Sequence, residues 1–247
     1  DQCPQAVRTV DGAPMGTEFV LFDFDGVIAN TEESNAAYLE KALSAFGIQL
    51  TDDERKALIG TNDKARIESL LSRSLVKVTA EDLAGKRRQV GNTYENSCIR
   101  PMPGVVSLIQ EIRGRGMKTG LVTSTSTRLI MIALNRMRMT ALFDVVICGD
   151  MCANHKPDPE CYKKAMDYLG AEPCKCIVFE DSAVGIHAAR LAGARVAAYR
   201  GSGIQQDVSE ADLIVDSYDE CKDMLDDIMQ GGKMQDRITQ GGIMPCK

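Results

Sequence analysis

The sequence lacks three features that would assign it to a broad class of proteins. No apolar run approaches the roughly 20 residues of a membrane-spanning helix, so no membrane partner is expected. Basic residues are not in excess, with 29 Lys and Arg against 35 Asp and Glu, and the net charge of -6 argues against a nucleic-acid partner. Residues 1–18 contain no apolar signal-peptide centre, so we expect a polar leader and a cytoplasmic protein.

Histidine is scarce and cysteine is abundant, but neither indicates a site. The two histidines, His155 and His187, are assigned no role, and the nine cysteines are expected to be free thiols in a reducing compartment. Zinc ligands have to converge on one ion, whereas the two cysteine pairs fall at opposite ends of neighbouring strands, about 17 Å apart. A zinc site is therefore not expected at these pairs, Cys148/Cys152 and Cys174/Cys176.

From residue 99 onward, short apolar runs alternate with helix-period segments. The runs are continuous rather than alternating in polarity, which is typical of strands buried on both faces. Strands are predicted at 118–124, 143–150, 175–181, 194–199 and 212–216, and helices at 104–116, 127–138, 159–170 and 182–193. This alternation predicts an α/β fold, a Rossmann-like parallel sheet with helices on both faces.

Residues 31–98 interrupt the alternation with an all-helical segment. An apolar stripe ends at Gly47, Thr51 and Glu54 form a capping-box pattern, and Thr79 is a candidate cap for another helix. We therefore expect an inserted helical cap domain. The complete prediction is a leader at 1–18, a catalytic core at 19–30 and 99–220, the cap at 31–98, and a C-terminal helix or tail at 221–247.

Polar side chains gather where the predicted strands end. Asp23 and Asp25 follow the first apolar run, and the other strands deliver a second set: Thr123, Ser124, Thr125, Asp150, Lys156, Glu180 and Asp181. Ligands of open parallel sheets bind beyond the carboxyl ends of the strands. Five carboxylates with a single lysine require a cation, and oxygen ligands favour Mg²⁺. For Asp150, a helix-capping role and a role beside the metal ligands both remain open.

The same edge carries groups suited to phosphate. Ser124, Thr125 and Lys156 can bind phosphoryl oxygens, and the helix that begins after Ser126 can direct backbone N–H groups toward an anion. A metal, phosphate-binding groups and a free carboxylate together indicate phosphoryl transfer.

Four motifs resemble those of the haloacid dehalogenase (HAD) superfamily, in the order found there. They are DFDGV at 23–27, VTSTS at 122–126, HKPDPE at 155–160 and VFEDSAVGI at 178–186. The resemblance covers roughly residues 19–216 and leaves room for the helical cap of that superfamily after the first motif. It is strongest to the branch of sugar phosphatases and β-phosphoglucomutases.

The resemblance implies a role for each motif residue. Asp23 would be the nucleophile that forms an aspartyl-phosphate, and Asp25 would be the general acid and base, with its backbone carbonyl on Mg²⁺. Asp23 and Asp181 would ligate the metal, with Glu180 as a ligand or a neighbour of one, while Ser124, Thr125 and Lys156 would hold the phosphoryl group. Because the dehalogenases lack the second aspartate, Asp25 argues against halide chemistry.

The sequence leaves three functions open. We expect a Mg²⁺-dependent phosphatase of a small phosphorylated metabolite such as a sugar phosphate, acting as a monomer or weak oligomer. A β-phosphoglucomutase-type mutase is the alternative. Against it, Asp63 stands near the position of the cap arginine of those enzymes and Asn35 replaces their cap-entry histidine, although Lys64 or Arg66 can substitute. A catalytically silent phosphate binder is the third possibility.

Overall fold

The computed structural model describes residues 16–58, 64–223 and 225–229, and a six-stranded sheet forms its centre. All neighbouring strands are parallel, in the order β3-β2-β1-β4-β5-β6. The strands are β1 (Phe19–Phe22), β2 (Lys118–Val122), β3 (Val145–Ile147), β4 (Cys176–Glu180), β5 (Arg195–Tyr199) and β6 (Leu213–Val215). The predicted parallel α/β fold is therefore confirmed, and each strand lies within or beside its expected range.

Strand β1 shows why the strands are continuously apolar. All four of its residues are buried. Successive side chains of a strand point to opposite faces, so Phe19 and Leu21 join one hydrophobic cluster whereas Val20 and Phe22 join the other. With both faces covered by helices, no position in β1 is free to be polar until the chain leaves the sheet at Asp23.

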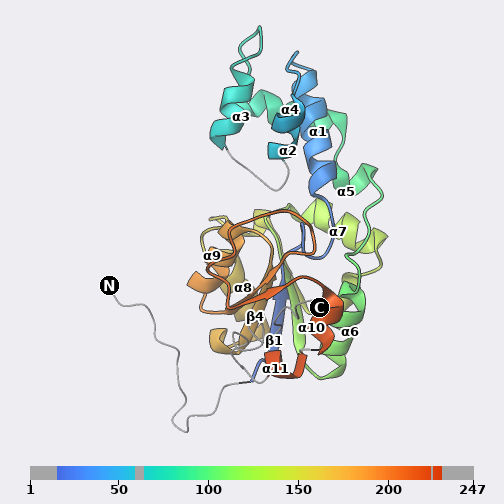
Figure 1. Cartoon of the computed structure of the whole chain (residues 1–247), viewed down its shortest axis with the longest axis vertical. Coiled ribbons are helices and arrows are strands. Elements are labelled where there is room, and N and C mark those ends of the chain that lie inside the picture. Colours follow the sequence, from blue (N-terminus) through green and yellow to red (C-terminus); the bar gives the residue numbers. More distant parts are fainter. Residues whose placement is uncertain (1–15, 59–63, 224, 230–247) are drawn as a thin grey trace, which may run out of the picture.

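Helices cover both faces of the sheet (Figure 1). The cluster on the Phe22 side includes residues of α6 (Val105–Gly114), α7 (Thr127–Arg136), α10 (Tyr218–Asp223) and α11 (Leu225–Met229). The opposite cluster includes residues of α8 (Glu160–Leu169) and α9 (Ala183–Leu191). Short 3-10 helices connect these elements: η1 (Thr140–Leu142), η2 (Gly149–Met151) and η3 (Pro173–Lys175).

A helical insertion separates β1 from β2, as expected for a cap, and α1 to α4 form a group beyond one end of the sheet (Figure 1). Its helices are α1 (Glu32–Ser44), α2 (Asp52–Ala57), α3 (Lys64–Leu71), α4 (Ala80–Val90) and α5 (Thr93–Asn96). Thr51 caps α2 in a capping box with Glu54, and Thr79 caps α4 with Asp82. The insertion has its own core, which includes Leu39 and Leu43.

Parts of the predicted domain scheme lie outside the described residues, namely 1–15, 59–63, 224 and 230–247. Residues 16–18, at the end of the expected leader, pack against the core: the Thr17 hydroxyl donates to the Ile228 carbonyl at 3.0 Å. The exact domain boundaries remain predictions. Within the described residues, no helix combines the length and apolar character needed to cross a membrane.

Candidate active site

The predicted site residues come from three central strands and one loop. Asp23 directly follows β1, Ser124 and Thr125 follow β2, and Glu180 ends β4 with Asp181 next in the chain. Strand β1 lies between β2 and β4, and the chain winds outward from it in both directions, which is where parallel α/β folds bind ligands. Lys156 reaches the same edge from the loop between η2 and α8.

Lys156 joins two of these carboxylates in a buried ion-pair network. Its Nζ lies 2.6 Å from Asp23 Oδ1 and 2.6 Å from Glu180 Oε1, and also contacts the Val122 carbonyl at 3.3 Å. The Lys156 and Glu180 side chains are 5% and 0% exposed. Tyr162, which sequence reasoning missed, donates to Glu180 Oε1 at 2.8 Å, and its ring centroid lies 4.9 Å from Lys156 Nζ. The lysine is thus fixed against Asp23.

Three carboxyl groups share a single lysine in this cluster. Burial raises the pKa of Asp23 to about 8; Lys156 opposes this increase, whereas the charges of Glu180 and Asp25 add to it. Burial likewise raises the pKa of Asp181 well above its ordinary value, with further contributions from Glu180 and Asp23. Burial alone would lower the pKa of Lys156, but the charges of Asp23 and Glu180 hold it well above its ordinary value. One lysine therefore does not neutralise the three carboxylates.

Glu180 is satisfied by donors on both oxygens. Besides Lys156 and Tyr162 on Oε1, Oε2 accepts hydrogen bonds from the backbone N–H of Asp181 at 3.0 Å and from the backbone and hydroxyl of Ser182 at 3.1 Å and 3.0 Å. Gly185 allows this arrangement, since a Cβ there would lie 1.8 Å from Glu180 Oε1. Glu180 thus ties the lysine to the start of α9, whether or not it also ligates a metal.

The donor set fits a hard divalent cation. Asp23, Glu180 and Asp181 each offer an oxygen, and these atoms lie within 4.8 Å of one another. Gly26, at φ +79°, leaves the space beside Asp181 open, because a Cβ there would lie 1.8 Å from Asp181 Oδ2. Converging carboxylate oxygens with excess negative charge are the ligands that Mg²⁺ prefers. The residues present are thus suited to the predicted metal.

Asp25 occupies a different environment, although it is only two residues from Asp23. Its Oδ1 accepts hydrogen bonds from the hydroxyls of Thr31 and of Tyr94, the latter at 2.7 Å, and its Oδ2 accepts one from Thr125 at 3.0 Å. Burial raises the pKa of Tyr94 well above its ordinary value, with a further increase from Asp25, so the hydroxyl retains its proton and donates. Thr31 and Tyr94 were not singled out by sequence reasoning.

The remaining predicted residues, Ser124, Thr125 and Asp150, differ in their contacts. The Ser124 side chain is exposed at the end of β2, whereas the Thr125 hydroxyl is engaged with Asp25. Asp150 caps α7: its Oδ1 accepts from the backbone and hydroxyl of Thr127 at 2.9 Å and 2.6 Å. The capping role left open for Asp150 is therefore the one seen, and this Thr127 N–H, which was expected to face an anion, is already paired.

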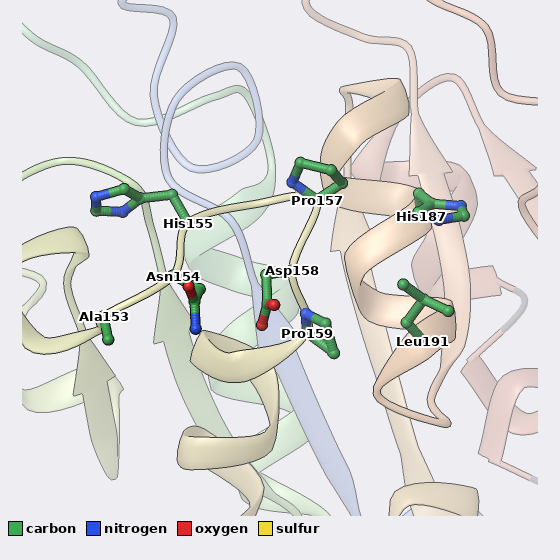
Figure 2. A pocket seen from close by; sticks show the side chains of 8 residues that line it. All are labelled: Ala153, Asn154, His155, Pro157, Asp158, Pro159, His187 and Leu191. Atoms are coloured by element: carbon green, nitrogen blue, oxygen red, sulfur yellow. The ribbon is translucent and has the colours of Figure 1, made fainter.

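A cavity of about 500 Å³ adjoins the loop between η2 and α8, which carries Lys156. Asp23, Glu180 and Asp181 do not line this cavity. It is lined by His155 and Pro157 on the loop and by His187 and Leu191 on α9, among others (Figure 2). His187 Nδ1 lies 2.8 Å from Glu210 Oε2, and both side chains are about half exposed. Neither histidine forms a hydrogen bond to the Asp23 cluster within the described residues.

The four motifs thus bring Asp23, Lys156 and Asp181 together at one edge of the sheet, and this arrangement can be compared with known proteins. Residues 20–199 match the haloacid dehalogenase-like hydrolase family, and the chain belongs to this family. The resemblance seen in the sequence is therefore confirmed.

Individual proteins show which members of this family the chain resembles. The chain is 30% identical to the phosphorylated carbohydrates phosphatase of Thermotoga maritima over 71% of this chain and 82% of the relative. It is 28% identical to N-acetylmuramic acid 6-phosphate phosphatase of Pseudomonas aeruginosa over 86% and 96%, respectively. The crystal structure of CbbY from Rhodobacter sphaeroides in complex with phosphate superposes with a TM-score of 0.69, at 27% identity, covering 83% of this chain and 96% of that one. The expected enzyme class, a phosphoric monoester hydrolase, is confirmed.

Proposed function

We propose that the chain is a Mg²⁺-dependent phosphatase that hydrolyses a small phosphorylated metabolite, a sugar phosphate in particular, through an aspartyl-phosphate on Asp23. The observation that carries the proposal is the buried Lys156 bridge between Asp23 and Glu180, beside Asp181. The substrate class is supported by the two relatives, a phosphorylated carbohydrates phosphatase and an N-acetylmuramic acid 6-phosphate phosphatase.

The first step is transfer of the phosphoryl group to Asp23. Lys156 holds the Asp23 carboxylate at 2.6 Å and orients the other oxygen for attack on phosphorus. As the P–O bond to the leaving group breaks, Asp25 gives its proton to the departing oxygen. Ser124 lies at the end of β2, where a hydroxyl can bind the transferred group. A Mg²⁺ ion held by Asp23, Asp181 and Glu180 would supply charge neutralisation for the phosphoryl oxygens.

The second step restores the enzyme. Asp25, now ionised, takes a proton from water, and the hydroxide oxygen forms the new bond to phosphorus while the bond to Asp23 breaks. Inorganic phosphate leaves and Asp25 is again protonated. Every atom and proton is thus supplied by the substrate, one water molecule, Asp23 and Asp25.

The test compares wild type with Asp23→Asn on p-nitrophenyl phosphate and on a panel of sugar phosphates. We expect turnover by wild type that requires Mg²⁺ and stops with EDTA, and a loss of at least 1000-fold in the variant, since the nucleophile is removed. Asp167→Asn, at an exposed position of α8 outside the four motifs, is the matched control and should retain activity. Absence of turnover across the panel would favour a silent phosphate binder instead.

The mutase remains the second candidate, because the crystal structure of a putative β-phosphoglucomutase from Thermotoga maritima matches the chain with a TM-score of 0.69 at 26% identity. Asp63 lies outside the described residues, and the side chain of Arg66, a possible replacement cation, donates to the Ala57 carbonyl. Asn35 lies in α1. Conversion of β-glucose 1-phosphate to the 6-phosphate after priming with a sugar bisphosphate would establish the mutase. A cytoplasmic location and a monomeric or weakly associated state remain proposals.

A further inference from the structure

Tyr94 connects the helical insertion to the second carboxylate of the site. Its hydroxyl lies 2.7 Å from Asp25 Oδ1 and 3.0 Å from Thr125 Oγ1. The residue is 6% exposed, and its ring lies beside Phe24, with centroids 6.1 Å apart. The hydroxyl therefore sits where the insertion, the first motif and the loop after β2 meet.

The backbone around Tyr94 is fixed to the core by two arginines of α7. Arg136 donates to the Tyr94 carbonyl at 2.6 Å and to the Ser97 carbonyl at 2.9 Å. Arg128 forms an ion pair with Glu95 at 2.6 Å. The Asn92 side chain caps α5 by accepting from the Glu95 N–H at 3.0 Å. Because α5 is held on both sides of Tyr94, the position of the hydroxyl is set by the core rather than by the tyrosine side chain alone.

The hydrogen bonds of Asp25 constrain the rotation of its carboxyl group. Thr31 and Tyr94 occupy one oxygen and Thr125 occupies the other, so the group is held at both ends. Thr31 and Thr125 lie on segments that leave β1 and β2, whereas Tyr94 approaches from the insertion. Loss of the tyrosine hydroxyl removes the only one of these three donors that comes from α5, so that Thr31 alone then holds Oδ1 and the carboxyl group is oriented less firmly.

We infer that Tyr94 is a positioning residue that orients Asp25 toward the leaving group of the substrate. This inference rests on the proposed function, in which Asp25 donates the proton that the departing oxygen takes up. Tyr94 does not touch the reacting atoms; it acts through the Asp25 carboxyl. Its contribution therefore depends on how much the leaving group needs a proton.

The test uses two aryl esters of similar size. p-Nitrophenolate leaves as a stable anion and needs little protonation, whereas the more basic phenolate needs the acid. The ratio kcat/KM covers the steps up to transfer of the phosphoryl group to Asp23, when the leaving group departs. We expect Tyr94→Phe to lower kcat/KM for phenyl phosphate about tenfold, a fraction of the effect of a general acid, and for p-nitrophenyl phosphate less than twofold.

Two further variants make the result specific. Thr93→Val removes a hydroxyl from the neighbouring buried position, where the oxygen has no hydrogen-bond partner in the described residues. This variant should leave kcat/KM for both esters unchanged. In an Asp25→Asn background, Tyr94→Phe should have no further effect on phenyl phosphate, because the group through which it acts is gone.

The outcomes separate the inference from the proposed function. An equal loss on both esters, no loss on either, a gain in rate, or loss of the folded circular dichroism spectrum would overturn the positioning role of Tyr94. A wild-type enzyme without Mg²⁺-dependent turnover of either ester, or an Asp23→Asn variant that retains it, would overturn the proposed function itself.

Discussion

Gly26 offers a direct test of the metal site, because a single methyl group there is placed against Asp181. The Cβ of Gly26→Ala would lie 1.8 Å from Asp181 Oδ2 and 2.6 Å from its carboxyl carbon, whereas ordinary contact begins at 3.4 Å. Asp181 has to move out of the carboxylate cluster or the backbone has to shift. In either case one of the three groups proposed to hold Mg²⁺ is displaced.

The matched control is Gly116→Ala, in the same sheet domain. Gly116 has a φ of +85°, close to the +79° of Gly26, but a Cβ there meets no atom within 4 Å. A non-glycine residue in this left-handed region costs about 1–2 kcal/mol, so both variants should lose this amount of unfolding free energy. The difference between them then reports the contact with Asp181 and not the backbone conformation.

We expect Gly26→Ala to need about 100-fold more Mg²⁺ for half-maximal hydrolysis of p-nitrophenyl phosphate, comparable to the upper range for disturbed metal surroundings. Gly116→Ala should titrate like wild type. Urea unfolding of both variants with and without Mg²⁺ supplies the stability comparison. Activation of Gly26→Ala at the same Mg²⁺ concentration as Gly116→Ala, with a kcat within twofold of the Gly116→Ala value, would refute a role of Asp181 in holding Mg²⁺.

Two other expectations follow from buried groups. Thr93→Val should raise the urea-unfolding free energy by about 1 kcal/mol, because it replaces a buried hydroxyl without a partner in the described residues; a less stable variant would contradict this. In the folded state without metal, the pKa of Asp23 is raised to about 8 from an ordinary 3.8. Between these pH values the folded state therefore binds more protons than the unfolded state, and stability is lost as pH rises from about 4 to about 8. Asp23→Asn should therefore gain more in Tm over wild type at pH 8 than at pH 5 in EDTA, and Mg²⁺ should narrow that gap; an equal gain at both pH values would count against it.

The fold and the central site residues were predictable from the sequence because both depend on patterns along single segments. Continuous apolar runs marked the strands, and the rule for strand ends brought Asp23, Lys156 and Asp181 to one edge. Lys156 reaches that edge although 133 residues separate it from Asp23. The motif order supplied the family and, with it, the expected insertion after the first strand.

Contacts made by side chains on separate segments could not be derived in this way. Tyr162 lies on the buried face of α8 and reaches Glu180 only because α8 packs on the sheet against β2 and β3. Tyr94 approaches Asp25 across 69 residues, from a four-residue helix whose position depends on Arg128 and Arg136. The two possible roles of Asp150 could be separated only by the position of Thr127, which the sequence leaves undetermined.

The two aspartates of the first motif have separate environments because of where β1 ends. Asp23 follows the strand directly, with its N–H donating to the Phe179 carbonyl at 2.9 Å, and its carboxylate meets Lys156 among other carboxylates. Two residues later the chain has left the sheet, and Asp25 meets only neutral hydroxyls among its described hydrogen-bond partners. Paired carboxylates in different surroundings can take different roles in one reaction. The Asp23 carboxylate lies among charged groups that suit a nucleophile beside a cation, whereas the Asp25 carboxyl is oriented by neutral hydroxyls. The division of labour proposed for Asp23 and Asp25 thus follows from one feature of the fold, the point at which the central strand stops.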